Sequence, residues 1–176
     1  TPAGRVGTLV CWEHWMPLAR QALHESAEEI HIAAWPTVRE MYQVASRHYA
    51  FEGRCFVVAV GQIIRAGDLP EGLELPPDLA GRPEALVSSG GSCIIGPDGA
   101  FLAGPVFDRE EILTADLDLG RIAEESMALD VTGHYSRPDI FEFSKHAPTP
   151  RPPGTGTGEA PAPRDPAAPP ARSAPR

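Results

Sequence analysis

Apolar residues along the first third of the chain gather in three short runs. They lie at residues 6–10 (VGTLV), 30–34 (IHIAA) and 55–60 (CFVVAV). Mostly apolar runs of this length are typical of β-strands that are buried in a sheet. We therefore predict three strands in this part of the chain.

Two segments between these runs have the periodicity of amphipathic helices. After Pro17, which suits the first turn of a helix, apolar residues recur at positions 18, 19, 22, 23 and 27. In the second segment Thr37 and Glu40 have the spacing of a capping box, and Gly53 is a typical helix stop. The order strand, helix, strand, helix, strand predicts an α/β fold, in which helices cover a mostly buried sheet.

Residues 66–91 interrupt this rhythm with four prolines and few periodic apolar residues. Loops of this length are commonly functional or disordered, so an active-site rim, a subunit contact and plain disorder are the alternatives. Beyond the loop, residues 92–96 and 100–103 flank a Pro-Asp-Gly turn and predict a hairpin. The remaining predicted elements are a strand over 112–117, a helix over 119–129 and an extended segment over 139–144.

The last thirty residues differ in composition from the rest. From 147 to 176 there are ten prolines and, proline aside, no apolar side chain larger than alanine. Such a segment cannot bury enough apolar surface to offset the entropy that ordering costs. We predict a folded domain over residues 1–146 and a Pro/Ala-rich disordered tail over 147–176, for which a proline-rich ligand of a partner protein is the alternative.

The overall charge and the cysteine count argue against several classes of protein. The net charge is −9, which opposes nucleic-acid binding because that function needs basic patches. No stretch reaches the length of a transmembrane helix, and the three cysteines suit neither a disulfide framework nor a zinc site. We expect a cytoplasmic protein with no metal, no cofactor, and neither a membrane nor a nucleic acid as partner.

Cys11 is the candidate nucleophile because of its place in the chain. It follows the first predicted strand and is followed at once by WEHWMP, where a helix is predicted to begin. Backbone N–H groups at a helix start favour an anion, and the thiolate form of cysteine is the nucleophile. A buried and inert cysteine is the alternative, which the apolar pattern alone does not exclude.

Cys11 lies in the first of seven short blocks that follow one another along the chain. They read GTLVCWEHWMPLAR (7–20), IHIAAWP (30–36), AFEGRCFV (50–57), GGSCIIGPDG (90–99), LAGP (102–105), ADLDL (115–119) and GHYSRPD (133–139). In this order they resemble the nitrilase family of carbon-nitrogen hydrolases. The Cys-Trp-Glu at the nucleophile and the GHYSRPD block are similar to nitrilases proper rather than to the amidase branches. His14 departs from the pattern, since the family commonly has Asn there.

The resemblance implies a fold and an incomplete catalytic set. The fold is the α-β-β-α sandwich of the nitrilase superfamily, of which this chain would be the C-terminal half. The family mechanism also uses a general-base Glu, a Lys and a further Glu that precede the nucleophile. The ten residues before Cys11 contain neither Glu nor Lys.

The implied reaction is the hydrolysis of a small-molecule nitrile to a carboxylic acid and ammonia, through a thioimidate and a thioester on Cys11. The resemblance also implies a homo-oligomer in which the C-terminal region makes subunit contacts. A cyanide hydrolase or hydratase and a superfamily amidase are the alternative activities. The non-enzyme alternative is an inactive fragment that acts only as an assembly module.

The residues near the nucleophile have predicted roles of their own. The backbone N–H of Trp12 follows the nucleophile and is the expected donor to the negative charge of the intermediate. Glu13 and His14 suggest a Cys–His–Glu triad, but adjacent residues rarely point usefully at one another, so we favour a supporting or surface role. Trp35 and Pro36 follow a predicted strand and are expected to line the substrate pocket. For Trp35, packing in the core is the alternative.

Three further residues are predicted to be structural. Glu52 lies near a predicted helix end, where we expect an ion pair with Arg54 or another arginine. Cys55 and Cys93 lie in apolar runs, so we expect both to be core residues rather than catalytic ones.

Overall fold

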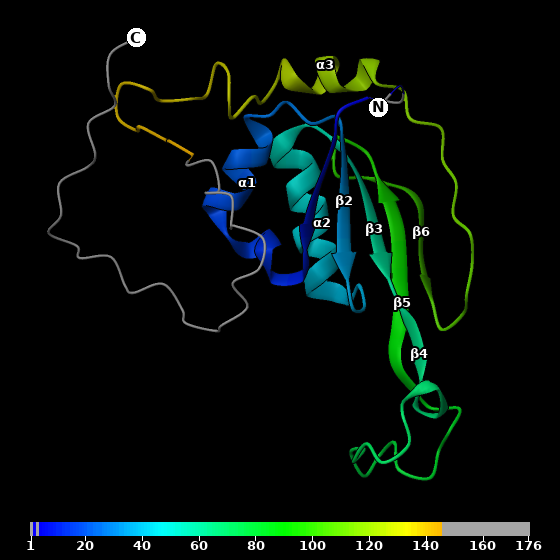
Figure 1. Cartoon of the computed structure of the whole chain (residues 1–176). Helices are drawn as coiled ribbons and strands as arrows, with labels where there is room; N and C mark the ends of the chain where they lie inside the picture. The colour runs from blue at the N-terminus through cyan, green and yellow to red at the C-terminus, as the bar shows by residue number, and fades with distance from the viewer. Residues whose placement is uncertain (1, 3, 146–176) are drawn as a thin grey trace, which may run out of the picture. The chain divides into compact units, whose positions relative to one another are not determined.

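A six-stranded mixed sheet is the main feature of the computed structural model, which describes residue 2 and residues 4–145 (Figure 1). The order of the strands is β1-β2-β3-β5-β4, and β6 pairs with β5. The strands are β1 (Val6–Val10), β2 (Ile30–Trp35), β3 (Phe56–Gly61), β4 (Ile63–Arg65), β5 (Leu86–Ile95) and β6 (Phe101–Phe107). The helices are α1 (Pro17–His24), α2 (Glu40–Gly53) and α3 (Gly120–Ser126), with short 3-10 helices η1 (Cys11–Trp15) and η2 (Ala66–Asp68).

The first three strands form the parallel half of the sheet. β1 pairs with β2 and β2 with β3 in parallel, so that Val10, Ala34 and Val60 share one register. Parallel neighbours need crossover connections, which α1 and α2 supply. The carboxyl ends of β1, β2 and β3 therefore lie side by side at one edge of the sheet.

The two faces of this parallel half are covered differently. On one face, buried residues of β2 and β3 pack with buried residues of α2 in the hydrophobic core, and α1 lies beside α2 (Figure 1). On the other face the apolar side chains of Val6, Val10 and Val60 are about half exposed. The described residues thus bury one face of these strands more completely than the other.

The antiparallel half of the sheet is built around β5, which pairs with β3, β4 and β6. Its Gly91 has φ +84, and a Cβ atom there would lie 2.5 Å from the carbonyl oxygen of Val38. Only glycine fits such a close backbone approach in this conformation. The register of the β5–β6 pair shifts next to this glycine, which is the sign of a β-bulge.

The α/β class and the first five predicted elements are confirmed, but several later predictions are wrong. The hairpin around Pro-Asp-Gly forms with longer strands, since β5 already begins at Leu86 and the long loop therefore ends earlier than predicted. Residues 112–117 and 139–144 form no strand, and α3 is shorter than the predicted helix. Ile112 is almost fully exposed, and without a neighbouring strand an apolar run has no ladder of hydrogen bonds to join.

The predicted capping box of α2 is also wrong. Arg39 is the N-cap residue, and it makes no side-chain cap hydrogen bond. The hydroxyl of Thr37 instead donates to the carbonyl oxygen of Gly90, which ties the start of α2 to β5. Tertiary contact with the sheet has replaced the local cap that the spacing predicts.

Among the described residues, residue 2 and residues 4–143 form one compact unit. The predicted disordered tail, 147–176, lies outside the described residues, so the boundary at 146 stays a prediction. Among the helices of the described residues, none is long and apolar enough to cross a membrane.

Candidate active site

Cys11 lies where β1 ends, and it adopts an uncommon backbone conformation. Its φ is +51°, in the left-handed region that non-glycine residues rarely occupy. Such conformations cost about 1–3 kcal/mol and persist where the surrounding structure enforces them, often at active sites. The side chain is partly buried and packs against the edge of the core.

The helix predicted to begin at the cysteine is not a regular α-helix. Cys11 opens the five-residue 3-10 helix η1, after which Met16 is extended and α1 begins at Pro17. The residue before a proline is biased away from the helical region, which explains the break at Met16. The prediction that an α-helix starts at the nucleophile is therefore corrected to a tight turn followed by a separate helix.

The side chains of Glu13 and His14 hold this turn together. A carboxylate oxygen of Glu13 accepts from the backbone N–H of Val10 at 2.8 Å, and His14 Nδ1 lies 2.7 Å from the carbonyl oxygen of Cys11. The other ring nitrogen of His14 faces His31 at 3.1 Å. Both ring nitrogens are thus engaged away from the sulfur, and the three residues do not form a Cys–His–Glu triad.

The solvent side of the turn is apolar. Trp12 is 69% exposed, and an open depression next to Cys11 is lined by the turn itself and its two neighbours, Val10, Cys11, Trp12, Glu13, Trp15 and Met16. Exposed aromatic and aliphatic side chains gathered in one place are typical of a surface that meets a ligand or a partner.

Trp35 and Pro36 end up in different surroundings. Trp35 is only 3% exposed and stacks on the ring of His14 with 4.5 Å between ring centroids, directly under the nucleophile turn. Its indole N–H donates to the hydroxyl of Ser46 at 3.1 Å. Pro36 is exposed, and its carbonyl accepts from the backbone N–H of Gln62. The structure brings Trp35 to Cys11 through His14, and it leaves Pro36 at the surface.

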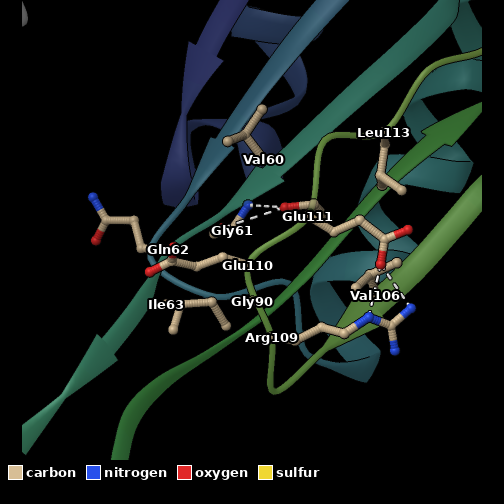
Figure 2. Close-up of a pocket in the computed structure, with 11 residues that line it drawn as sticks. Val60, Gly61, Gln62, Ile63, Gly90, Val106, Arg109, Glu110, Glu111 and Leu113 are labelled. Carbon is tan, nitrogen blue, oxygen red and sulfur yellow. Dashed lines mark hydrogen bonds and ion pairs between the residues drawn. The ribbon is translucent and has the colours of Figure 1, made fainter.

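A pocket that the sequence did not indicate opens at the same edge of the sheet (Figure 2). It has a volume of about 400 Å³ and is lined by Val60, Gly61, Gln62, Ile63, Gly90, Ser92, Val106, Arg109, Glu110, Glu111 and Leu113. Val60 is in register with Val10 two strands away, about 10 Å at the usual strand spacing. Ligands of open α/β sheets bind at the carboxyl ends of the strands, and this rule was the signal that could have found the pocket.

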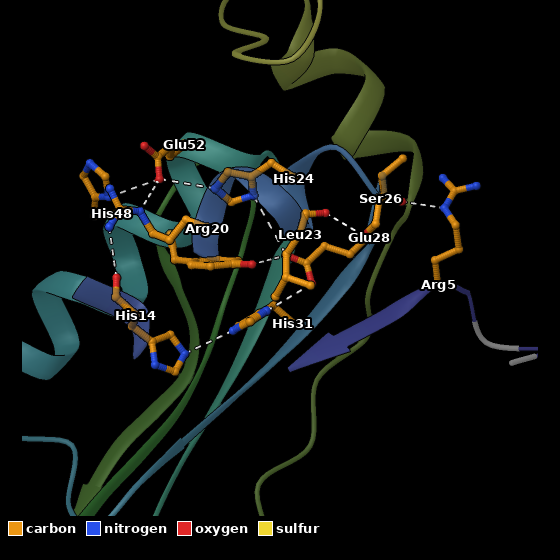
Figure 3. A network of polar contacts seen from close by, with 12 residues as sticks. Arg5, His14, Arg20, Leu23, His24, Ser26, Glu28, His31, His48 and Glu52 are labelled. Atoms are coloured by element: carbon orange, nitrogen blue, oxygen red, sulfur yellow. Dashed lines mark hydrogen bonds and ion pairs between the residues drawn. The ribbon is translucent and has the colours of Figure 1, made fainter. Parts of the chain in front are cut away.

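Beneath the turn, polar side chains form a buried network (Figure 3). His14 contacts His31, and His31 Nδ1 lies 3.0 Å from a carboxylate oxygen of Glu28. The hydroxyl of Tyr49 donates to the other oxygen of Glu28. Sequence reasoning missed this network, because its members come from η1, β2, α2 and the loop before β2, and no motif joins them.

The network continues through α1 toward the surface. Glu52 accepts from Arg20 Nε at 2.7 Å and from His24 at 3.2 Å. Burial alone would raise the pKa of Glu52, but the hydrogen bonds from His24 and Arg20 and the charge of Arg20 lower it to about 2. The predicted ion pair of Glu52 is therefore made with another arginine, Arg20, while Arg54 pairs with Glu125 at 3.4 Å.

The other two cysteines are core residues, as predicted. Cys55 and Cys93 are buried in the hydrophobic cluster between the sheet and α2. Burial raises the pKa of the Cys93 thiol to about 12, and it raises the pKa of Cys55 as well. A thiol with such a high pKa is a poor nucleophile at neutral pH. Among residues 2 and 4–145, no group of three or more His, Cys, Asp or Glu side chains is arranged to hold a metal ion.

Comparison with known protein families matches residues 1–125 to the family described as carbon-nitrogen hydrolase. The chain belongs to this family. It is 42% identical over 150 residues to a bifunctional nitrilase/nitrile hydratase of Lupinus angustifolius. The matched region covers 81% of this chain and 42% of that protein. The chain is 39% identical over 143 residues to an aliphatic nitrilase of Sinorhizobium fredii, covering 81% of this chain and 46% of that one. The chain thus spans less than half the length of these relatives.

Solved structures agree with the fold. The crystal structure of a carbon-nitrogen hydrolase from Helicobacter pylori is 26% identical and matches with a TM-score of 0.55, over 72% of this chain and 44% of that one. The NitFhit protein of C. elegans matches with a TM-score of 0.56 over 81% of this chain and 31% of that one, at 18% identity. The mixed sheet with its helices is therefore the fold of part of a carbon-nitrogen hydrolase.

Proposed function

We propose that the full-length protein hydrolyses a small organic nitrile to a carboxylic acid and ammonia, with Cys11 as the nucleophile. The observation that carries the proposal is the contrast among the three thiols. Cys11 is partly exposed, has a left-handed backbone conformation and lies at the carboxyl end of β1 within the segment matched to carbon-nitrogen hydrolases. Cys55 and Cys93 are sealed in the core.

The proposed reaction consumes two waters for each nitrile. The thiolate of Cys11 adds to the nitrile carbon, the nitrogen takes up a proton, and a thioimidate forms. The first water adds to the thioimidate, and the tetrahedral intermediate expels ammonia to leave a thioester. The second water releases the carboxylic acid and restores the thiol.

The remaining roles follow from position. The backbone N–H of Trp12 would donate to the charge that develops on the intermediate. Pro36 stays a candidate wall of the substrate pocket because it is exposed, whereas Trp35 would act as the support beneath the turn. The glutamates and the lysine of the family mechanism would come from residues outside these 176.

A second candidate activity is nitrile hydration. If the tetrahedral intermediate expels the Cys11 thiolate instead of ammonia, one nitrile and one water give one amide. The similarity to relatives described as bifunctional nitrilase/nitrile hydratases supports this branch. A cyanide hydrolase or hydratase, a superfamily amidase and a non-catalytic assembly module are the further alternatives.

We also propose that the enzyme is a cytoplasmic homo-oligomer that binds a small-molecule nitrile and neither a nucleic acid nor a membrane. The exposed side chains of Tyr135, Ile140 and Phe141 support a subunit contact in the C-terminal part of the folded unit. Three free thiols fit a reducing compartment.

The test compares Cys11→Ala with the matched control Cys93→Ala in the full-length protein. Ammonia, acid and amide are measured with aliphatic and aromatic nitriles, cyanide and simple amides as substrates. We expect Cys11→Ala to lower ammonia release by at least about 10³-fold, because no thioimidate can form, while Cys93→Ala keeps its rate per folded molecule. Undiminished ammonia release by Cys11→Ala would overturn the nucleophile, and a parent that hydrolyses only amides or nothing would favour the alternatives.

A further inference from the structure

Two buried histidines face each other beneath the nucleophile turn (Figure 3). His14 is 2% exposed and His31 is fully buried, and their Nε2 atoms lie 3.1 Å apart. The second nitrogen of each ring has a partner of its own. His14 Nδ1 lies 2.7 Å from the carbonyl oxygen of Cys11, and His31 Nδ1 lies 3.0 Å from a carboxylate oxygen of Glu28.

These four contacts restrict the number of protons. A carbonyl oxygen only accepts, so His14 Nδ1 must donate to Cys11, and a neutral His14 then has a lone pair at Nε2. If Glu28 is ionised, His31 Nδ1 donates to it, and a neutral His31 also has a lone pair at Nε2. Two lone pairs would face each other at 3.1 Å in a buried site, which leaves both polar atoms unsatisfied.

We infer that His14, His31 and Glu28 hold one proton more than two neutral histidines and a carboxylate would, and that His31 Nε2 therefore donates to His14 Nε2. The extra proton resides on His31 beside an ionised Glu28, or on Glu28 as a donor to a neutral His31. In both arrangements His31 donates to His14, and His14 donates to the carbonyl of Cys11. The three side chains are positioning residues for the nucleophile turn.

The surroundings keep the extra proton away from His14. Burial lowers the pKa of His14, the Cys11 carbonyl opposes that shift, and the neighbouring His31 adds to it. Glu28, in contrast, is in direct contact with His31 and also accepts from the hydroxyl of Tyr49. A proton on the His31–Glu28 side is therefore balanced by the carboxylate.

The charged groups packed around the network and the stacked rings fix its geometry. From α1, His24 Nδ1 lies 3.9 Å from Glu28, and Arg20 donates to the backbone carbonyl of His14. From α2, Tyr49 stacks on His31 with 3.8 Å between ring centroids. These contacts leave the two imidazoles little freedom to turn away from each other.

The consequence for chemistry depends on the peptide between Cys11 and Trp12. In a trans peptide the N–H points opposite to the C=O, so holding the Cys11 carbonyl toward His14 turns the Trp12 N–H away from the core. A hydrogen bond to the carbonyl also polarises the N–H of the same peptide and makes it a better donor. This catalytic consequence rests on the proposed function, in which the Trp12 N–H stabilises the intermediate. The proton arrangement of His14, His31 and Glu28 does not depend on that function.

The first test uses two amides that replace the two halves of the imidazole. In His14→Asn the amide nitrogen takes the place of Nδ1, and in His14→Gln it takes the place of Nε2. The readout is the rate at which iodoacetamide alkylates Cys11 in the full-length protein, followed on the Cys11 peptide by mass spectrometry. It needs no nitrile turnover, so it stays informative if the proposed function fails.

We expect His14→Asn to alkylate within about threefold of the parent and His14→Gln to be at least about tenfold slower, because only Asn can still donate to Cys11. If the His14 side chain merely filled space, His14→Gln should alkylate closer to the parent rate than His14→Asn, since Gln is the larger residue. An alkylation rate of His14→Gln equal to or above that of His14→Asn would overturn the inference.

The second test detects the protons directly and does not depend on either variant folding well. In full-length protein labelled with ¹⁵N-histidine, long-range ¹H–¹⁵N spectra distinguish protonated from bare ring nitrogens. We expect His14 to be protonated at Nδ1 only and His31 to be protonated at Nε2. In Glu28→Gln the amide can donate to His31, so we expect a neutral His31 protonated at Nε2 with His14 unchanged. A parent in which His14 is protonated at Nε2, or His31 only at Nδ1, would overturn the inference.

Discussion

Cys11 directly follows the first strand of the central sheet and Cys93 lies within its strand β5, and both end or interrupt apolar stretches of sequence, yet their surroundings have little in common. Cys93 points into an apolar core formed by the sheet and α2. Cys11 lies one residue beyond β1, with a left-handed backbone, an apolar depression on one side and a buried polar network on the other. The comparison teaches that backbone conformation and neighbours, rather than residue type, make a thiol available for chemistry.

The two regions also differ in the kind of contact that stabilises them. Around Cys93 the contacts are apolar and non-directional, and a small change in volume is their main vulnerability. Around Cys11 the contacts are directional hydrogen bonds among buried histidines, a tyrosine and carboxylates. Such a network is strong only when every member is satisfied.

The largest expected difference is in thiol reactivity. Burial raises the pKa of Cys93 from 9.0 to about 12, so at neutral pH its thiolate is about a thousandfold scarcer than that of an ordinary cysteine. We expect iodoacetamide to modify Cys11 at least about a thousandfold faster than Cys93 in the native full-length protein, because Cys93 is also shielded by its burial. Peptide mass spectrometry at short reaction times measures both rates in one sample.

Unfolding the protein in guanidinium chloride supplies the control for this comparison. There all three cysteines should react at similar rates, since neither burial nor the turn persists. Comparable modification of Cys93 and Cys11 in the native protein would contradict the contrast between the two regions.

A smaller effect is expected from Gly7, which lies on β1 below the network. A Cβ atom at this position would lie 1.8 Å from Glu28 Oε2, and Glu28 is fixed by His31 and Tyr49. We expect Gly7→Ala to lower the free energy of unfolding by about 2–4 kcal/mol, because the buried carboxylate must leave its donors. Urea denaturation of the full-length protein measures the loss, and Cys11 alkylation should change with it.

Thr8→Ala is the matched control on the next residue of the same strand. The side chain of Thr8 points to the other face, and its hydroxyl donates to the carbonyl oxygen of Ile32 at 3.0 Å. The loss of this hydrogen bond should cost about 0.5–1.5 kcal/mol. If Gly7→Ala lowers the free energy of unfolding by no more than Thr8→Ala does, the network does not constrain this strand.

The sequence allows the parallel half of the fold to be predicted but only part of the site. Apolar runs and helical periodicity are local signals, and they locate β1, α1, β2, α2 and β3 to within a few residues. Residues 112–117 have a similar apolar pattern and form no strand, because pairing depends on a neighbour that no local pattern specifies. The position of Cys11 after a strand also suggested that a helix begins at the cysteine, but Met16 before Pro17 is extended and separates η1 from α1.

The network under Cys11 shows the limit most clearly. Its position after a strand makes Cys11 a candidate, and the resemblance to nitrilases selects it. Glu28 and Tyr49 carry no such signal. Tyr49 reaches His31 only through the packing of α2 on the sheet, and Glu28 lies three residues before His31 in a loop where no motif marks it. Side-chain networks between elements arise from tertiary structure, and a single sequence records the residues without recording which of them meet.

The smallest effect predicted for the network is a loss of stability in acid on the Cys11 side of the molecule. Despite its burial, Glu52 has a pKa lowered from 4.5 to about 2 by its hydrogen bonds to His24 and Arg20. A lowered pKa in the folded state means that the unfolded chain binds the proton more readily, so stability falls as the pH falls. The contribution of Glu52 should be complete above about pH 5 and should disappear as the pH approaches 2.

We expect this contribution to be about 1–2 kcal/mol, because Glu52 is partly exposed and solvent screens its charge. The measurement is urea denaturation of the parent and Glu52→Gln between pH 7 and pH 3, in which the difference between the two should shrink with acid. Asp139→Asn is the matched control, since the Arg137–Asp139 pair is well exposed and its removal should hardly alter the pH dependence. Because Arg20 donates both to Glu52 and to the carbonyl of His14, protonation of Glu52 should also loosen the nucleophile turn. A parent and a Glu52→Gln variant whose stabilities differ equally at pH 7 and pH 3 would show that acid does not act on the Cys11 region through this carboxylate.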